Sequence, residues 1–193
     1  MYLVHKPSSS GDVKQFAMKV IKRESLLKKT EYEQGQMISE IRTMRSLDRC
    51  EGSVRLFKVF ESDNYLNLLM EYQQGGSLSA LLENKNAKLT DDTARVITEQ
   101  LLLTVDFMTK MGIVHRDLKP ENILLYFKDP KVFDVRVADF GYALKLKDQG
   151  KMENILVCGT PGYIAPEGIS GKGLSAKTDI FSIGAILFGM LTS

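Results

Sequence analysis

The sequence predicts an α+β fold, in which a small antiparallel β-sheet with one helix precedes a mainly α-helical part. Short apolar runs separated by Gly, Pro, Ser and Asn fill residues 1–72, whereas residues 73–193 hold longer stretches with apolar residues at helical spacing. The chain has 193 residues, 44% of them hydrophobic, which is enough to bury a sizeable core. We therefore treat residues 1–72 and 73–193 as two lobes.

The first lobe is expected to contain four strands and one helix. Residues 2–5 and 15–21 read as a β-hairpin around a Pro, Ser and Gly-rich turn, and residues 54–60 and 65–72 as two further strands. Between these pairs, residues 30–47 read as a helix with Met37, Ile41 and Met44 on one face.

The second lobe begins with a long helix over residues 89–111. Thr90 is a plausible N-cap and Gly112 the expected C-cap. Residues 123–126 and 133–138 read as two strands around a turn at residues 128–130. The run from Ile180 to Leu191 is too short to span a bilayer, and we expect a buried helix there.

Composition excludes some classes of protein. The chain has 26 Lys and Arg against 24 Asp and Glu, a net charge of +2, so neither a nucleic acid nor a membrane surface is an expected partner. Cys50 and Cys158 are far apart and lack a metal-ligand spacing, and the N-terminus lacks the apolar run of a signal peptide. These features predict free thiols in a reducing compartment, the cytoplasm or the nucleus.

The stretch from Gly112 to Leu125 carries the densest group of reactive side chains. Asp117 can accept or orient a hydroxyl proton, Lys119 can offset charge on a transferring phosphoryl group, and Asn122 can hold a divalent cation. A charged surface turn is the alternative reading of the same residues.

The sequence HRDLKPEN at residues 115–122, followed by DFG at residues 139–141, resembles the catalytic loop and metal-binding triplet of eukaryotic protein kinases. The segment CGTPGYIAPE at residues 158–167 is similar to the end of the kinase activation segment. The resemblance runs from Tyr2 to the last residue, implies a bilobal kinase fold, and lies nearest the calcium/calmodulin-dependent group of serine/threonine kinases.

The resemblance implies a site for ATP and Mg²⁺. Lys19 would hold the α and β phosphates with Glu40 as its ion-pair partner, while Glu33 is a rival partner whose spacing fits less well. Asn122 and Asp139 would bind the metal. The remaining positions implied to contact the nucleotide are Ala17, Met70, Glu71, Tyr72 and Leu124. A solvated lysine is the alternative for Lys19.

The implied activity is transfer of the γ-phosphoryl group of ATP to Ser or Thr hydroxyls of protein substrates, with Asp117 and Lys119 as catalytic residues. Lys119 together with Thr160 is typical of kinases with Ser or Thr acceptors. The alternative is an inactive, truncated kinase-like module that binds or scaffolds. Asp179 is similar to the buried aspartate that ties the following helix to the catalytic loop.

Control by phosphorylation of the activation segment is not expected, because residues 143–159 contain no Ser, Thr or Tyr. Leu156 stands where a phosphothreonine often lies in kinases that carry Arg116, and Glu153 is a candidate partner for that arginine. Compared with the family, the chain lacks the glycine-rich loop before Tyr2 and the arginine that pairs with the glutamate at Glu167. We therefore expect a chain truncated at both ends, with an unpaired carboxylate at Glu167.

Overall fold

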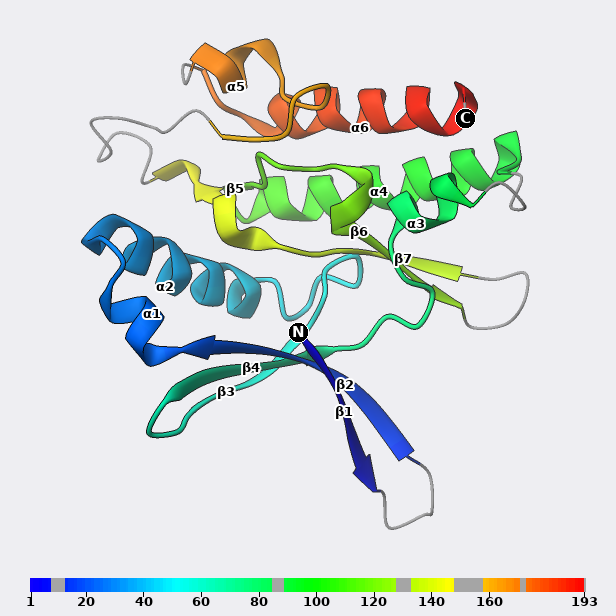
Figure 1. Cartoon of the computed structure of the whole chain (residues 1–193). Helices are drawn as coiled ribbons and strands as arrows, with labels where there is room; N and C mark the ends of the chain where they lie inside the picture. The colour runs from blue at the N-terminus through cyan, green and yellow to red at the C-terminus, as the bar shows by residue number, and fades with distance from the viewer. Residues whose placement is uncertain (8–12, 85–88, 128–132, 148–157, 171–172, 193) are drawn as a thin grey trace.

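The computed structural model describes residues 1–7, 13–84, 89–127, 133–147, 158–170 and 173–192. It places a four-stranded sheet and its helices at one end of the molecule and the long helices α4 and α6 at the other (Figure 1). The predicted α+β fold is confirmed. One continuous core of buried side chains runs through both parts, from Met44 and Leu68 to Leu101 and Ile186.

The sheet has the strand order β1-β2-β4-β3, and every neighbouring pair is antiparallel. The bounds are Tyr2–Pro7 for β1, Val13–Lys22 for β2, Leu56–Glu61 for β3 and Tyr65–Glu71 for β4. In the register of β2 and β4, Ala17 lies opposite Met70 and Lys19 opposite Leu68. Ala17 and Lys19 therefore share one face of the sheet, because side chains alternate along a strand.

Two helices follow β2, where one was expected. Helix α2 (Glu31–Ser46) has a capping box, in which the Thr30 hydroxyl accepts from the Glu33 N–H and the Glu33 carboxylate accepts from the Thr30 N–H. Helix α1 (Arg23–Leu27) is five residues long and buries none of them. So short a segment has no apolar periodicity by which the sequence could predict it.

The second part starts with α3 (Leu78–Glu83), which has Ser77 as its N-cap and was not predicted. Helix α4 (Asp91–Lys110) is capped by Thr90, as expected, while its C-cap is Met111. Gly112 follows with a φ of 66°, a left-handed conformation that glycine adopts without steric cost. That residue turns the chain out of the helix and into the loop beyond it.

Several short elements frame this loop. Strand β5 (Ile113–Val114) pairs with β8 (Leu144–Lys145), and β6 (Ile123–Phe127) pairs with β7 (Phe133–Val137). The 3₁₀ turns are η1 (Pro120–Asn122) and η2 (Phe140–Tyr142), and helix α5 spans Pro166–Ser170.

Helix α6 (Ala176–Thr192) packs against α4, but it is not the buried helix that the sequence predicts. Ile183, Ile186 and Met190 face the core, whereas Phe188 is 69% exposed and Leu191 54% exposed. The sequence of α6 has apolar residues on every face, so it could not predict which face is exposed. Only an amphipathic pattern distinguishes the buried side of a helix. In the part of the chain that is described, no helix combines the length and the apolar character needed to cross a membrane.

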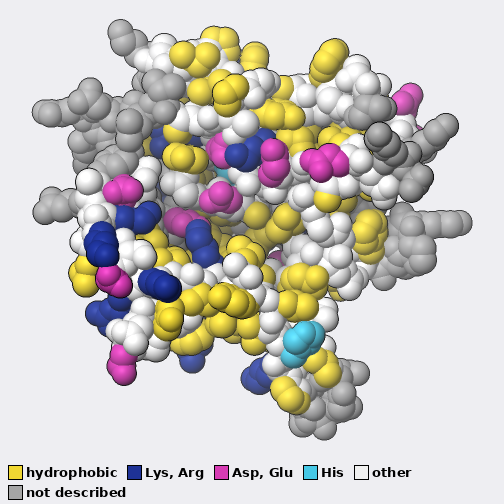
Figure 2. Space-filling model, in the orientation of Figure 1, with side chains coloured by type: hydrophobic (Ala, Val, Ile, Leu, Met, Phe, Trp, Pro, Cys, Tyr) yellow, Lys and Arg dark blue, Asp and Glu magenta, His cyan; other side chains and the backbone are white. Residues whose placement is uncertain are grey.

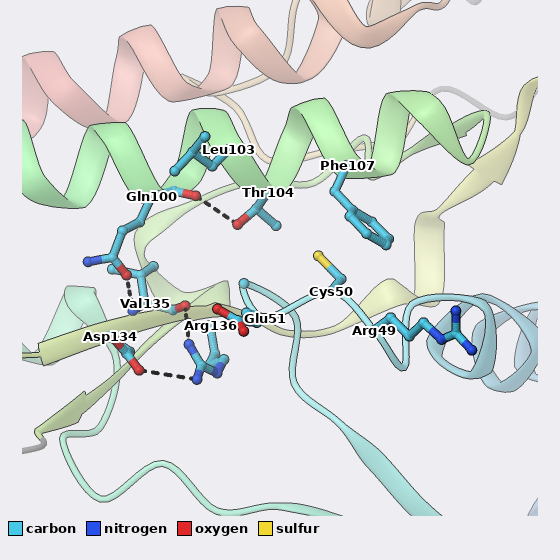
Figure 3. A pocket seen from close by; sticks show the side chains of 11 residues that line it. Arg49, Cys50, Glu51, Gln100, Leu103, Thr104, Phe107, Asp134, Val135 and Arg136 are labelled. Carbon is cyan, nitrogen blue, oxygen red and sulfur yellow. Dashed lines mark hydrogen bonds and ion pairs between the residues drawn. The ribbon is translucent and has the colours of Figure 1, made fainter.

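The loop between α2 and β3 fastens the two parts together. Gly52 accepts from the Val137 N–H at 2.7 Å, and Val54 donates to the Val137 carbonyl at 2.9 Å. A Cβ at Gly52 would lie 1.7 Å from the Thr104 hydroxyl oxygen, so α4 and this loop approach as closely as a glycine permits. Beside this contact is a cavity of about 440 Å³, into which Cys50, Glu51 and Phe107 extend (Figure 3).

Candidate active site

Residues 115–122 form a loop whose backbone is hydrogen-bonded to helix α6. The Asp179 carboxylate is fully buried and accepts from the backbone N–H groups of His115 at 2.8 Å and Arg116 at 2.9 Å. Burial raises the pKa of Asp179, although the nearby His115 and the hydrogen bonds from both N–H groups oppose the rise. Arg116 has a φ of 69°, a costly conformation that this carboxylate helps to hold.

The buried ring of His115 joins this loop to the triplet at residues 139–141. Its Nδ1 accepts from the Asp117 N–H at 3.3 Å, so Nε2 carries the proton that is shared with the Ala138 carbonyl at 3.1 Å. The ring also packs edge-on against Phe140, with centroids 5.0 Å apart. Asp117 and Asp139 are thereby fixed relative to each other.

The two predicted catalytic residues meet at a third side chain. Thr160 donates its hydroxyl proton to Asp117 Oδ1 at 2.7 Å and accepts from Lys119 Nζ at 2.8 Å. Lys119 Nζ also lies 3.1 Å from Asp117 Oδ2. Asp117 is buried, and its carboxylate is therefore oriented by a cation and a hydroxyl together. The sequence singled out Thr160 only through the resemblance and did not predict this contact.

Asn122 and Asp139 come from neighbouring strand ends. The Ala138 N–H donates to the Asn122 carbonyl at 2.9 Å, which places Asp139 just past the position opposite Asn122. The Asn122 side-chain nitrogen donates to the Asp117 carbonyl at 2.9 Å, which leaves the carboxamide oxygen as the group available to a ligand. Asp139 is exposed with a φ of 61°, and its Oδ1 accepts from the Gly141 N–H at 3.3 Å.

The predicted ion pair between strand β2 and helix α2 is confirmed. Lys19 Nζ lies 2.7 Å from Glu40 Oε1, and the Glu40 side chain is 8% exposed. The rival Glu33 is instead part of the capping box of α2, where hydrogen bonds from Thr30 lower its pKa. A capping glutamate at the start of the helix cannot reach Lys19 as well, so the alternative for Glu33 is wrong.

Strand β4 leads into the segment that joins the two parts. Met70 is buried, and Tyr72 and Leu124 are half-buried. The side chain of Glu71 turns toward two arginines, with Oε2 accepting from the Arg55 N–H at 3.3 Å and lying 3.8 Å from Arg136 Nε. The Glu71 N–H is also taken, since it donates to the Arg55 carbonyl at 2.9 Å.

After Tyr72 the segment runs alongside β6. The Gly75 N–H donates to the Leu125 carbonyl at 2.9 Å, and the Leu125 N–H donates to the Gly76 carbonyl at 2.8 Å. Gln73 is 5% exposed, and neither of its side-chain amide atoms has a hydrogen-bond partner among the residues that the structure describes. A buried amide without partners is costly, so this segment gains if a polar ligand or water reaches it.

The charged side chains gather across the middle of one face, between the sheet and the helical part, where the surface is hollowed (Figure 2). The cavity of Figure 3 contains none of the predicted site residues. Of its two arginines, Arg49 and Arg136, the second lies 3.3 Å from Asp134 Oδ2, and the Gln100 side-chain oxygen accepts from the Val135 N–H at 2.7 Å. The candidate active site is therefore the group of side chains around the loop of residues 115–122, away from this cavity.

Two further expectations concern Glu167 and Arg116. Glu167 is half-buried and accepts from the Thr178 hydroxyl at 3.2 Å, which is a neutral partner where the resemblance implies an arginine. Arg116 Nε donates to the Tyr142 carbonyl at 2.7 Å. Glu153 and Leu156 lie outside the described residues.

Known proteins resemble this chain over most of its length. The family model described as "Protein kinase domain" matches residues 3–193. The calcium/calmodulin-dependent protein kinase type 1 of Caenorhabditis elegans is 35% identical over 191 residues, which are 99% of this chain and 51% of that protein.

Two other relatives are similar over shorter shares of their own length. The serine/threonine-protein kinase cds1 of Schizosaccharomyces pombe is 36% identical over 93% of this chain and 39% of that protein. A cGMP-dependent protein kinase of Drosophila melanogaster, isozyme 2 forms cD5/T2, is 35% identical over 95% of this chain and 19% of that protein. The chain thus spans about half or less of the length of these relatives.

Proposed function

Because the chain belongs to the protein kinase family, we propose that it transfers the γ-phosphoryl group of ATP to Ser or Thr hydroxyls of protein substrates. The observation that carries this proposal is the buried Asp117 carboxylate, oriented by Lys119 and Thr160. Phosphoryl transfer demands positioning and charge compensation more than covalent chemistry, and this arrangement offers both.

Each of the three side chains has a proposed part in the transfer. Asp117 orients the acceptor hydroxyl and accepts its proton at a carboxylate oxygen. Lys119 places a positive charge beside the carboxylate, where it offsets negative charge that develops on the transferring group. Thr160 fixes both side chains in the position that the reaction needs.

The nucleotide would lie under the sheet, with Lys19 on its phosphates and Ala17, Met70, Tyr72 and Leu124 around its base. Glu40 holds Lys19 in place through the 2.7 Å ion pair. The side chain and the N–H of Glu71 are both engaged by Arg55. The Glu71 backbone carbonyl remains the candidate contact to the base.

Asn122 and Asp139 fit a divalent cation. A carboxamide oxygen and an exposed carboxylate are hard oxygen donors of the kind that Mg²⁺ prefers beside phosphate oxygens. Bound there, Mg²⁺ would neutralise charge on the phosphates. The chain's own contribution is to hold the two donors together through the Ala138 to Asn122 hydrogen bond.

The relatives support a Ser/Thr substrate class, since those named above include a serine/threonine-protein kinase. Residues 1–72 and 73–193 are the two proposed lobes. The free thiols of Cys50 and Cys158 support a reducing compartment, the cytoplasm or the nucleus. No observation favours the alternative of an inactive scaffold.

The test is phosphate transfer from radiolabelled ATP to a Ser-containing peptide by the purified chain and by the Asp117→Asn variant. We expect the substitution to lower kcat by about 10²- to 10⁴-fold, as for loss of a general base. Asp106→Asn is the matched control, because Asp106 is an exposed residue of α4 that pairs with Lys110.

A second variant tests the nucleotide site. Lys19→Ala should cost on the order of 3 kcal/mol of transition-state stabilisation. A folded wild-type chain that transfers no phosphate, or an Asp117→Asn variant with unchanged turnover, would contradict the proposal. Circular dichroism of each variant separates loss of activity from loss of fold.

A further inference from the structure

A lysine beyond the metal-binding triplet contacts the helix that carries Glu40. Lys145 Nζ donates to the Ser46 hydroxyl oxygen at 3.0 Å, in a partly buried hydrogen bond between residues 99 positions apart. Neither residue belongs to the catalytic or binding machinery described above. The contact joins strand β8 to the last turn of α2.

In helix α2, the hydroxyl oxygen of Ser46 is oriented to accept from Lys145. The Ser46 hydroxyl donates its proton to the Arg42 carbonyl at 2.7 Å, so its lone pairs are left to accept from Lys145. Glu40 lies less than two turns earlier on the same helix and holds Lys19 at 2.7 Å. A rigid helix transmits a displacement of its last turn to Glu40.

On the other side, Lys145 is anchored to the strand that precedes the catalytic loop. Lys145 pairs with Ile113 in the β5–β8 ladder, and the Leu146 N–H donates to the Gly112 carbonyl at 2.8 Å. Strand β5 runs directly into His115. The turn η2, which follows Asp139, also packs against α2. The Lys145–Ser46 bond therefore spans the two halves of the candidate active site.

We propose that Lys145 is a positioning residue, which holds α2 through Ser46 so that Glu40 stays paired with Lys19. This inference rests on the proposed function. Residues 143–159 contain no hydroxyl side chain that could carry a phosphate, and the Nε of Arg116 donates to the Tyr142 carbonyl. The position of α2 is thus set by the chain's own lysine, without covalent modification of that segment.

The experiment compares four proteins: wild type, Lys145→Met, Ser46→Ala and the double variant. Lys147→Met is the matched control, because Lys147 is an exposed lysine of the same segment. Hydrogen–deuterium exchange without nucleotide measures the backbone amides of residues 36–44. We expect exchange about fivefold faster in either single variant, and no faster again in the double variant, because one hydrogen bond is lost in all three.

Kinetics supply the second readout. Lys145→Met should raise the KM for ATP about fivefold and leave the KM for the peptide unchanged, whereas a general loss of structure would alter both. Lys145→Arg keeps a cationic donor, so its KM for ATP should be close to that of wild type.

The outcomes separate the two proposals. Exchange in residues 36–44 that stays at the wild-type rate in Lys145→Met, or rises equally in Lys147→Met, would overturn the positioning role. Additive effects of the two single variants would overturn it as well, since residues that act through one bond are not additive. A wild-type chain without transferase activity would defeat the proposed function, while the exchange result would still decide the role of Lys145.

Discussion

Thr160 and Asp117 lie 43 positions apart in the chain, and their side-chain oxygens are 2.7 Å apart. The bond connects the segment before helix α5 directly to the candidate catalytic carboxylate. Lys119 donates to the same hydroxyl, so Thr160 is hydrogen-bonded to Asp117 and Lys119 together. A displacement of the segment 158–165 is therefore passed to the Asp117 carboxylate through the Thr160 side chain.

Thr160→Val tests this contact. Valine keeps the shape of threonine but removes both hydrogen bonds, so Asp117 loses one of the groups that orient it. We expect kcat for peptide phosphorylation to fall by about tenfold to a hundredfold, with a smaller change in the KM for ATP. Steady-state kinetics at saturating ATP measure the effect.

Two control variants test whether the Thr160 hydroxyl is the group that matters. Thr160→Ser retains the hydroxyl and should keep most of the activity. Thr109→Val makes the same replacement at an exposed position, where the hydroxyl donates to the Val105 carbonyl of its own helix, and should leave kcat unchanged. Equal losses in the Thr160→Val and Thr160→Ser variants would show that the hydroxyl is not the important group.

Asp179 should give the free energy of unfolding a characteristic pH dependence. Burial raises its pKa above the ordinary value of 3.8, so the folded protein binds this proton more tightly than the unfolded chain. Its contribution to the free energy of unfolding is fully present below that ordinary value and is lost as the pH rises through the raised pKa.

Urea unfolding of wild type and Asp179→Asn, from about pH 4 to pH 8, measures this contribution. Asparagine does not titrate, so the stability of wild type relative to the variant should decline with rising pH. Asp106→Asn, on the exposed side of α4, should show no such trend. A difference that grows with pH would mean that the pKa of Asp179 is lowered instead.

Gly52→Ala tests the close approach of the α2–β3 loop to helix α4. The added methyl group would overlap the hydroxyl of Thr104, a buried side chain with little freedom to move. We expect a loss of about 1–3 kcal/mol in the free energy of unfolding, measured by urea denaturation.

Gly35→Ala is the matched control, since nothing lies within 4 Å of a Cβ at that exposed helical position. Alanine there should be neutral or should stabilise α2 by up to about 1 kcal/mol. Adding Thr104→Ala to Gly52→Ala should recover part of the loss. If both glycine variants behaved alike, overlap with Thr104 would not be the cause.

The two thiols should react slowly in the folded protein. Burial raises the pKa of both Cys50 and Cys158, so little thiolate forms at neutral pH. We expect alkylation by iodoacetamide at about pH 8 to be at least about tenfold slower than in urea, and to accelerate as the pH rises further. A Cys50→Ser variant assigns the rate to Cys158; equal rates with and without urea would contradict the prediction.

The sequence predicted the elements whose signals are local. Thr90, read as an N-cap, marked the start of α4. The Lys19–Glu40 pair was also found in advance, although through the resemblance to kinases and not through any local pattern.

Contacts that depend on tertiary structure could not be predicted from the sequence. The Thr160 hydroxyl, the Glu71 contacts with Arg55 and Arg136, and the Lys145–Ser46 bond all join segments whose relative position no local pattern specifies. The exposed face of α6 was missed for another reason. Phe188 and Leu191 are as apolar as the buried Ile186, so composition alone could not assign them to solvent.

The contact between Asp179 and His115 has a consequence for the order of assembly during synthesis. The two residues are 64 positions apart, and the carboxylate that shapes the loop belongs to helix α6. A nascent chain that has emerged only as far as α5 already contains Lys19, Glu40, Asp117 and Asp139, yet its loop still lacks the acceptor for two backbone N–H groups. These side chains are therefore synthesised before the helix whose carboxylate accepts from the loop, and the two N–H groups gain this acceptor only once α6 has emerged.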